Sequence, residues 1–343
     1  MVSPMPSRDV VVVGASAGGV EALRALVGGL PPDLPAAVLV VLHMPRFSPS
    51  ALPLILHRAG PLPAAAAVDG QPLARGRVYV SAVDHHLLIL DGRVRLSTGP
   101  LENGHRPAID PLFRSAARAY GSRVVGVVLS GARDDGAAGL AAIVGAGGVA
   151  VVQDPADALH ASMPRVALEH TTVDHVVPAG KMGPLIAELV QAAADIDRDD
   201  PDDSELLTAE VAMANHAPLS TDELNVPAAG YGCPNCGGAL FEIHSRPVPR
   251  FRCRVGHAWS PDSLLEEQAI ALEGALWMAL RTLEEKKALS QRMASTGFER
   301  RLPGTTRRYR MLADDAQRAV DLIRDVIARL GRTSGAEETH SEE

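Results

Sequence analysis

The feature that most constrains the fold is a run of valines followed at once by a turn of small residues. Val10–Val13 lead into Gly14-Ala15-Ser16-Ala17-Gly18-Gly19, and an Ala/Leu-rich segment follows from Val20 to Val27. A β-branched run that ends in glycines is typical of a buried parallel strand. Glycines on both sides of Ser16 suit the sharp strand-to-helix turn that exposes a nucleophilic serine. This stretch therefore predicts an α/β layer fold with Ser16 at the first turn.

Three other interpretations of the turn around Ser16 compete with a nucleophile. A dinucleotide-binding loop would need the spacing G-x-G-x-x-G and an acidic residue at the end of the next strand, where this chain has His43. Ser16 could instead be only the N-cap of the helix. The glycine amides could also form a phosphate nest. The ten residues alone leave these interpretations open.

Apolar strands alternate with helical segments through the first part of the chain. Further buried strands are expected at 36–42, 123–129 and 149–153 and around 176, and helices at 50–57, 107–120, 163–169 and from 182. Short strands near 77–80, 86–90 and 93–96 are joined by the hairpin signal Asp91-Gly92. The pattern predicts a doubly wound, mostly parallel sheet with an antiparallel hairpin addition.

Three of the apolar strands end in residues that could act together. The first ends at Ser16, the second at His43, and the strand 123–129 runs into a loop that contains Asp134-Asp135-Gly136. Because the carboxyl ends of parallel strands meet at one edge of a sheet, these groups are expected to lie together. A serine needs an imidazole to take its proton, and the imidazole needs a carboxylate to orient it. The sequence thus predicts a serine hydrolase, with the Ala17 amide as an oxyanion donor.

Composition excludes some classes of protein. The 343 residues are 46% hydrophobic and carry a formal net charge of −8, so a sizeable core is expected and a general nucleic-acid binder is not. No apolar run reaches the length of a membrane span, and no signal-peptide pattern opens the chain. We expect a cytoplasmic protein without direct membrane insertion.

All three cysteines fall in one short C-terminal stretch. Cys233-x2-Cys236 is followed, after a gap of hairpin length, by Cys253-x3-His257. Three thiolates and one imidazole at this spacing suit a tetrahedral structural zinc site with no open position. The alternative is three reduced cysteines and an unrelated histidine. We therefore expect structural zinc and no cofactor for catalysis.

The chain is predicted to have five parts. They are a catalytic domain at 1–194, an acidic linker at 195–228, a zinc-ribbon-like module at 229–260, a helical hairpin at 261–331 and a disordered acidic tail at 332–343. The hairpin is expected from helical spacing of apolar residues on both sides of Pro303-Gly304. Its apolar stripe could pack internally, dimerise or bind another signalling protein, and internal packing is favoured.

Several motifs in chain order resemble one known family. They are GASAGG around Ser16, LHMP around His43, GHRPAIDPLFRSAA at 104–117, LSGARDDGAAGL at 129–140, and QDPADA with SMP at 153–164. Together they resemble the catalytic domain of the bacterial chemotaxis protein-glutamate methylesterase, the CheB family. The resemblance implies that Ser16 is the nucleophile, His43 the general base and Asp135 the triad acid, with Asp134 as its neighbouring rival.

The resemblance implies a reaction and its partners. The family hydrolyses glutamate γ-methyl esters on chemoreceptors, releasing methanol, and also deamidates glutamine side chains. Methylated cytoplasmic receptor helices or related signalling proteins are therefore the expected partners, with no nucleic acid. Arg106, in the GHRPAID motif, would help to orient an acidic receptor helix, or would only cap the core or lie at the surface. Other possibilities are a non-catalytic regulatory or binding module on the same fold and an esterase for a different acyl substrate.

This sequence departs from the family pattern in two ways. Ala17 stands where the family often has threonine, and Ala132 stands where it often has methionine. Loss of a hydroxyl beside the oxyanion site would lower the rate or alter the substrate, although the main-chain donors remain. The chain also begins directly with the catalytic strand, without the N-terminal receiver domain that is usual in the family. Regulation by phosphorylation of its own receiver is therefore not expected.

Overall fold

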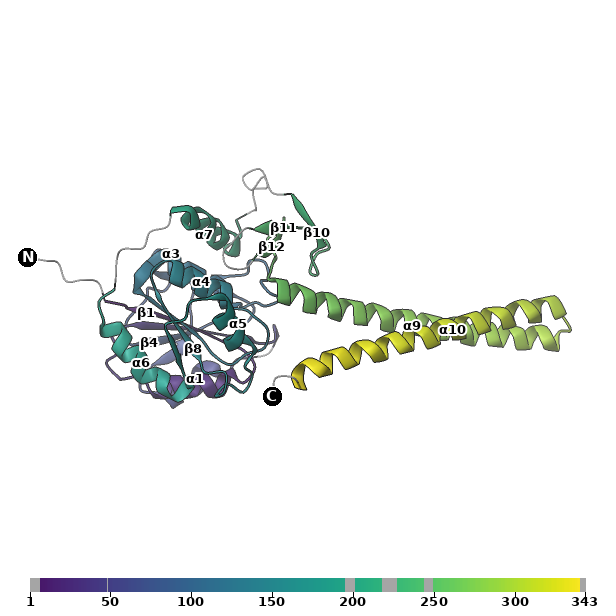
Figure 1. Cartoon of the computed structure of the whole chain (residues 1–343), viewed down its shortest axis with the longest axis horizontal. Coiled ribbons are helices and arrows are strands. Elements are labelled where there is room, and N and C mark those ends of the chain that lie inside the picture. The colour runs from purple at the N-terminus through teal and green to yellow at the C-terminus, as the bar shows by residue number, and fades with distance from the viewer. Residues whose placement is uncertain (1–6, 48, 195–200, 218–226, 244–248, 340–343) are drawn as a thin grey trace, which may run out of the picture. The chain divides into compact units, whose positions relative to one another are not determined.

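The computed structural model describes residues 7–47, 49–194, 201–217, 227–243 and 249–339 (Figure 1). The chain divides into two compact units, Met1–Leu264 and Leu265–Glu343. The first unit contains the α/β sheet and two smaller sheets, and the second unit contains a pair of long helices. None of the described helices is both long and apolar enough to cross a membrane.

A seven-stranded sheet in which every strand pairs in parallel lies at the centre of the first unit. In spatial order its strands are β3 (Ala64–Ala66), β4 (Arg77–Val80), β2 (Ala37–Leu42), β1 (Val10–Ala15), β7 (Val124–Val128), β8 (Val149–Gln153) and β9 (His175–Val177). The chain moves outward from β1 to β3 and β4, then returns to β7 on the other side of β1. Such a change of direction is where sheets of this kind place functional groups, beyond the carboxyl ends of the strands. The predicted doubly wound sheet is confirmed.

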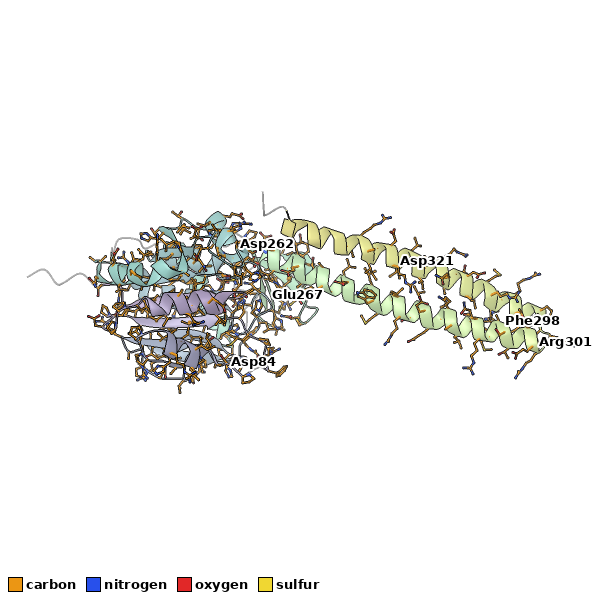
Figure 2. The ribbon with its side chains drawn as sticks, turned by 90° about the horizontal axis from the view of Figure 1, so that it is seen from below. Asp84, Asp262, Glu267, Phe298, Arg301 and Asp321 are labelled. Atoms are coloured by element: carbon orange, nitrogen blue, oxygen red, sulfur yellow. The ribbon has the colours of Figure 1, made fainter. Side chains whose placement is uncertain are left out.

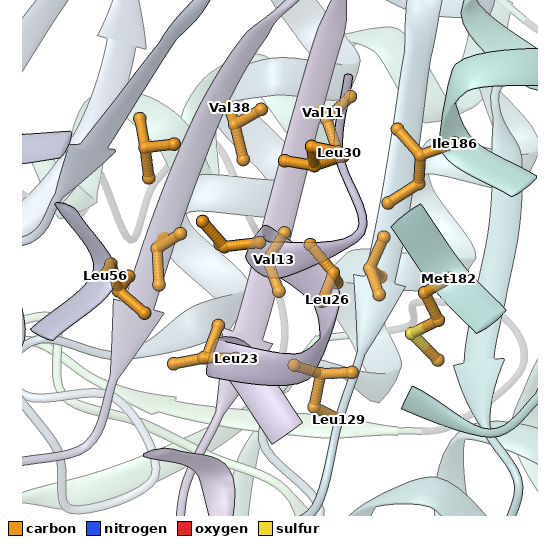
Figure 3. Packing of buried hydrophobic residues seen from close by; sticks show 14 of the residues in the cluster. Val11, Val13, Leu23, Leu26, Leu30, Val38, Leu56, Leu129, Met182 and Ile186 are labelled. Carbon is orange, nitrogen blue, oxygen red and sulfur yellow. The ribbon is translucent and has the colours of Figure 1, made fainter. Parts of the chain in front are cut away.

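Alternate residues of β1 face two separate hydrophobic layers. Val11 and Val13 belong to the cluster shown in Figure 3, whereas Val10 and Val12 belong to a second cluster on the opposite face. The period of two along a strand explains this division. Both faces are therefore covered by helices, as a strand of consecutive valines requires.

Three helices contribute to the layer of Figure 3, namely α1 (Gly19–Gly28), α2 (Leu52–Ala59) and α6 (Ala179–Gln191). Three others contribute to the opposite layer, namely α3 (Ile109–Tyr120), α4 (Ala137–Gly145) and α5 (Ser162–His170), and a 3-10 turn at Gly121–Arg123 follows α3. Leu23, Leu26 and Ile186 point toward Val13 and its neighbours in Figure 3. Apolar side chains thus fix each helix against the sheet.

The predicted hairpin forms a separate two-stranded sheet. Strands β5 (His86–Leu90) and β6 (Arg93–Ser97) pair antiparallel around Asp91 and Gly92, whose φ angles are 50° and 70°. Two positive φ values are what a tight hairpin turn between twisted strands needs. Leu87 and Ile89 pack into the same layer as α3. The hairpin therefore covers the sheet and does not extend it.

A helix occupies part of the stretch predicted as a linker. Helix α7 (Pro201–Ala214) buries Glu210, Val211 and Met213, and its last carbonyl accepts a hydrogen bond from Ser97 Oγ at 2.7 Å. An acidic linker was predicted for 195–228, whereas Pro201–Ala214 within that stretch is helical. Acidic composition suggested solvent exposure, but contacts of the later turns with β6 and α3 stabilise a helix. Residues 195–200 and 218–226 lie outside the described part of the chain.

The cysteine-containing region is a small antiparallel sheet, here called the ribbon. Its strands are β10 (Ala228–Gly232), β11 (Ala239–Ile243), β12 (Arg250–Cys253) and β13 (Ala258–Trp259). Its compact core includes Leu240, Phe251, Trp259 and Leu264. Few apolar side chains are buried there, so a module of this size needs further stabilisation by metal or by docking.

The second unit is a helical hairpin. Helix α9 (Pro261–Glu299) begins in the first unit, and α10 (Pro303–Thr339) follows after a short turn. Figure 2 shows Phe298 and Arg301 at the end where one helix passes to the other. Arg324 Nη2 lies 2.8 Å from Glu284 Oε1 between the two helices. Helix α10 continues to Thr339, so 332–339 is helical where a disordered tail was predicted, and 340–343 lie outside the described residues.

Candidate active site

Ser16 lies in the turn between β1 and α1. Its amide donates to Ser130 O at 2.9 Å, and its carbonyl accepts from Gly19 N at 2.9 Å. Gly18 has a φ of 69°, and a Cβ atom there would lie 2.8 Å from both Leu159 Cβ and Ser130 Oγ. Only glycine fits that position without strain. The local sequence therefore folds into a tight turn that presents Ser16 at the edge of the sheet.

His43 follows β2 and lies beside Ser16. Its backbone amide continues the ladder to Ala15 O at 3.1 Å, which brings the two strand ends together. His43 Nδ1 is 3.1 Å from Ser16 Oγ, and His43 Nε2 is 2.7 Å from Asp135 Oδ2. The three side chains named from the strand ends thus form one continuous hydrogen-bonded chain.

The imidazole is oriented with Nδ1 toward the serine. In the chymotrypsin arrangement Nε2 faces the serine and Nδ1 faces the aspartate, so the ring of His43 is reversed. To accept the proton of Ser16, Nδ1 must be unprotonated, and Nε2 must then donate to Asp135. The hydrogen-bond partners assign this tautomer. The reversed ring can perform the same proton transfer.

Asp135 is held in the loop between β7 and α4. Its carboxylate is buried, and it accepts hydrogen bonds from Ile109 N at 2.6 Å, Asn103 Nδ2 at 3.1 Å and Asp110 N at 3.3 Å. Burial opposes ionisation, but hydrogen bonding and charge from His43, together with the Ile109 amide, lower the pKa of Asp135 to about 2. The carboxylate is therefore ionised at neutral pH and faces the imidazole.

Asp134, the neighbouring candidate, points elsewhere. Its Oδ1 accepts a hydrogen bond from Ser263 Oγ at 2.5 Å. Burial raises the pKa of the Asp134 carboxyl, although hydrogen bonds from Ser260 and Ser263 oppose the rise. The loop thus directs one carboxylate to His43 and the other to the start of α9.

His105 stacks on one face of the His43 ring. The two ring centroids are 3.8 Å apart, and the planes differ by 13°. Burial and the charge of His43 lower the pKa of His105 to about 3, so this imidazole is neutral at pH 7. Sequence reasoning missed His105 and Asn103. The available signal was the GHRPAID motif, which contains His105 and directly follows Asn103.

Arg106 is engaged by its own surroundings. Its Nε donates to Asp84 Oδ1 at 3.0 Å, and its Nη1 donates to the carbonyls of Thr98 and Gly99 at 2.7 and 2.8 Å. Nη2 lies 2.9 Å from the same Asp84 oxygen. With these N–H groups occupied, the geometry favours the structural alternative for Arg106 over the alternative of a contact with substrate.

Ala17 is the residue whose amide is predicted to be an oxyanion donor. It directly follows Ser16 and precedes the first turn of α1, and its carbonyl accepts from Ser130 Oγ at 2.8 Å. Within the described residues its N–H makes no hydrogen bond. The amide is therefore available to a negative oxygen that develops beside Ser16.

The four predicted metal ligands converge in the ribbon. One ligand atom from each of Cys233, Cys236, Cys253 and His257 lies within 4.8 Å of all the others. Cys236 Sγ is 3.7 Å from Cys253 Sγ, and His257 Nδ1 is 3.7 Å from Cys233 Sγ and 3.6 Å from Cys253 Sγ. A zinc tetrahedron with Zn–S bonds of about 2.3 Å has edges of about 3.8 Å. The donor set and its spacing therefore fit a tetrahedral ion.

A further donor supports the metal cluster. Trp259 Nε1 lies 3.4 Å from Cys233 Sγ, and Trp259 is fully buried in the ribbon core. Hydrogen bonds to ligand atoms of this kind orient the ligands and stabilise thiolate charge. The ribbon thus has the ligands and the support of a closed structural site.

The fold and the site define an α/β protein in which hydrogen bonds connect a serine, a histidine and an aspartate at the carboxyl edge of a parallel sheet. Comparison with known families agrees with this class. The family model described as CheB methylesterase matches residues 11–186. The chain belongs to the CheB methylesterase family.

Individual relatives share the same part of the chain. A protein-glutamate methylesterase/protein-glutamine glutaminase of Anaeromyxobacter dehalogenans is 42% identical over 183 residues, which are 53% of this chain and 54% of that protein. A putative protein of the same name from Leptospira interrogans is 38% identical over 184 residues, 53% of this chain and 95% of that protein. The chain thus spans about half the length of the Anaeromyxobacter relative.

A solved structure has the same fold. The crystal structure of the Thermotoga maritima CheB methylesterase catalytic domain is 32% identical, with a TM-score of 0.52. The match covers 54% of this chain and 100% of that domain. The ribbon and the helical hairpin lie beyond the residues that the family model matches.

Proposed function

We propose that this protein is a serine hydrolase that demethylates glutamate γ-methyl esters, and deamidates glutamine side chains, on chemoreceptors or related signalling proteins. The observation that carries the proposal is the hydrogen-bonded chain from Ser16 through His43 to Asp135. Membership of a family whose relatives are named methylesterase and glutaminase supplies the substrate class.

Acylation begins with the Ser16 hydroxyl. Ser16 Oγ attacks the ester carbonyl carbon while His43 Nδ1, 3.1 Å away, takes its proton. The carbonyl oxygen becomes negative and is stabilised by the Ala17 N–H and the positive end of α1. The tetrahedral intermediate collapses, the C–O bond to the methoxy group breaks, and His43 returns the proton so that methanol leaves.

Deacylation repeats these steps with water. His43 Nδ1 takes a proton from a water molecule, which attacks the acyl-enzyme carbonyl and restores a free glutamate carboxylate and Ser16. Deamidation differs only in its first leaving group, which is ammonia. In every step Asp135 holds the Nε2–H of His43 and stabilises the imidazolium that forms.

The surroundings of His43 suit this proton transfer. Its side chain is 6% exposed and that of Asp135 is 1% exposed, so the ion pair that forms is shielded from water. His105 stacks on the ring as a neutral group and therefore adds no positive charge that would oppose protonation of His43.

The Cys3His cluster has a structural role in this proposal. Bound zinc would cross-link the two ends of the ribbon and leave no coordination position for substrate. Cys233, Cys236, Cys253 and His257 would hold it. The hydrolytic steps therefore depend on the protein's side chains and amides alone.

The test is methanol release from a methylated receptor cytoplasmic domain by the purified full chain. Ser16→Ala removes the nucleophile and should abolish release, whereas Ser295→Ala, on exposed α9, is the matched control and should not. Labelling of Ser16 by a fluorophosphonate measures the reactive serine independently of substrate. Labelling without methanol release would indicate another acyl substrate. Absence of both would indicate a non-catalytic binding module.

A further inference from the structure

Asn103 connects the ribbon to the acid of the triad. It lies in the segment between β6 and α3, and its side chain is 1% exposed. Its Nδ2 donates to Asp135 Oδ1 at 3.1 Å and lies 3.4 Å from Asp110 Oδ2. Its Oδ1 accepts from Ser260 N at 3.0 Å. One buried amide therefore links the residue after the ribbon's last strand to Asp135.

The backbone of this segment also pairs with the ribbon. Asn103 N donates to Ala258 O at 2.8 Å, and Ala258 N donates to Leu101 O at 3.2 Å. Glu102 and Ala258 thus form an isolated parallel bridge. Ala258 directly follows His257, one of the four candidate metal ligands. Backbone hydrogen bonds to Ala258 therefore couple residues 101–103 to the neighbouring candidate metal ligand, His257.

A buried cluster of ion pairs also holds the ribbon strand β12 against Glu102. Glu102 Oε2 accepts from Arg250 Nη2 at 3.1 Å, Glu102 Oε1 accepts from Arg252 Nη2 at 2.9 Å, and Arg114 of α3 bonds the same carboxylate. Glu210 of α7 accepts from Arg250 Nη1 at 2.7 Å. Separating β12 from Glu102 and Glu210 would leave buried charges without partners, which is strongly unfavourable.

The loop that carries Asp135 is held from the same side. Ser263, in the first turn of α9, donates to Asp134 Oδ1 at 2.5 Å. The residues from 250 to 263 therefore contact both segments that position the triad acid, namely 101–103 and 134–135. No contact between the two units of the chain is involved, because these residues all belong to the first unit.

From these contacts, and building on the proposed hydrolase function, we propose that Asn103 is a positioning residue for Asp135 and that the metal-loaded ribbon holds it in place. Metal binding by the Cys3His cluster would then set the reactivity of Ser16 from outside the catalytic layer. The ribbon is in this view part of the active-site scaffold.

Few residues separate the metal cluster from Asp135. In the ribbon, Cys253 N bonds His257 O at 3.1 Å, so the turn that precedes Ala258 is closed between two metal ligands. Without metal the turn is closed only by its backbone hydrogen bonds, so we expect Ala258 and Ser260 to move away from Asn103 while the cluster of ion pairs still holds Arg250 and Arg252. Asn103 then loses its partners on one side, and Asp135 loses a donor that orients its carboxylate toward His43. Ser16 and His43 stay in place, because β1 and β2 hold them.

The first experiment compares variants of the full chain by their rate of fluorophosphonate labelling at Ser16. Asn103→Ala should slow labelling on the order of tenfold or more, as expected for loss of a residue that orients a reactive group. Asn215→Ala removes a hydrogen bond to Arg95 remote from the triad and is the matched control. A normal rate for Asn103→Ala would overturn the positioning role.

A spectroscopic measurement separates positioning from general stability. The proton on His43 Nε2, bonded to Asp135, should give a downfield NMR resonance in the metal-loaded protein and in Asn215→Ala. The resonance should be lost or broadened in Asn103→Ala. Its persistence unchanged in that variant would also overturn the proposal.

Removal of metal by a chelator, followed by addition of Zn²⁺, supplies a second perturbation that needs no substitution. Metal-free wild type should label as slowly as metal-loaded Asn103→Ala, should lose the same resonance, and should recover both with Zn²⁺. Metal removal from Asn103→Ala should then add little, because both changes act through one contact. Equal slowing in both backgrounds, or full reactivity without metal, would contradict the coupling.

The proposed function and this inference fail in different ways. No labelling of metal-loaded wild type would overturn the hydrolase itself, and the positioning role with it. Labelling without methanol release from receptor would overturn only the substrate. Labelling that does not depend on Asn103 or on metal would overturn only the inference.

Discussion

The imidazole rings of His43 and His105 stack face to face, with centroids 3.8 Å apart. His43 bonds Ser16 and Asp135 through its two nitrogens, so the stack fixes the remaining freedom of the ring, its tilt. A neutral ring on this face excludes water from the proton-transferring imidazole. His105 is therefore a positioning residue for His43 in the mechanism proposed above.

Replacement of His105 tests the stack directly. His105→Ala should slow fluorophosphonate labelling of Ser16 by roughly threefold to tenfold, because an aromatic pair contributes about 0.5–1.5 kcal/mol beyond its buried area. His105→Phe keeps a ring against His43 and should label at a rate close to wild type. Equal rates for His105→Ala and wild type would show that the stack does not position the base.

The buried histidines predict how stability depends on pH. His105 has a pKa near 3 in the folded protein, and burial also lowers the pKa of His86, against an ordinary value near 6.5. Between pH 6.5 and about 3 only the unfolded chain binds the His105 proton, and the lowered pKa of His86 acts in the same direction, so unfolding becomes easier as pH falls below 6.5. For His105 the free energy of unfolding should drop by as much as about 1.4 kcal/mol per pH unit.

Other ionisable groups lie near His105, so the test is a difference between proteins. His43, Asp135 and Arg133 face His105, and Asp110, whose pKa is raised to about 6 by burial and by Asp135, opposes the trend between pH 6 and 4. His105→Phe should lower the slope of stability against pH between 6.5 and 5. Urea unfolding at a series of pH values measures it, and an unchanged slope would rule out His105 as a contributor.

The adjacent residues Asp134 and Asp135 allow a matched test of which carboxylate acts in the triad. Asp135→Asn removes the charge that stabilises the His43 imidazolium and should lower methanol release and Ser16 labelling by roughly 10³-fold or more. Asp134→Asn keeps an oxygen that accepts from Ser263 Oγ and should cost at most a few-fold. The reverse ranking of the two variants in a labelling assay would assign the triad acid to Asp134.

The sequence was sufficient to predict the layers of the fold. The valine runs that became β1, β2 and β7 are apolar on both faces, so they could only form the buried centre of a parallel sheet. The meeting of Ser16, His43 and the Asp134–Asp135 loop followed from the ends of those strands. The choice of Asp135 over Asp134 depended on the family resemblance, since neighbouring acids in one loop cannot be ranked by spacing.

What the sequence did not predict depends on contacts between distant residues. Asn103 and His105 lie in an irregular segment whose position is set by Ala258 and Ser260, about 150 residues further along the chain. No periodicity marks such a segment. Helix α7 was missed for a similar reason, because the acidic composition gave no sign that Glu210 would be buried between arginines of β12.

The substitution Gly131→Ala tests how closely Ser16 is packed. Gly131 follows Ser130 in the loop after β7, and its amide and carbonyl are bonded to His160 O at 3.0 Å and Met163 N at 2.9 Å, so the backbone cannot retreat. A Cβ atom there would lie 2.8 Å from Ser16 Cβ and would overlap Met163 Sδ. Gly131→Ala should therefore displace Ser16 and slow its labelling, at a cost of about 1–3 kcal/mol in stability from overpacking.

The matched control for Gly131 is Gly180→Ala in α6, where an added Cβ meets no atom within 4 Å. That variant should label normally and unfold at the same or a higher urea concentration, because alanine suits a helix better than glycine. Labelling rates and urea midpoints of the two variants give the comparison. If Gly131→Ala reacted at the wild-type rate, Ser16 would have room to move, and the reactive position of its hydroxyl would not depend on the close packing of the β1 and β7 turns.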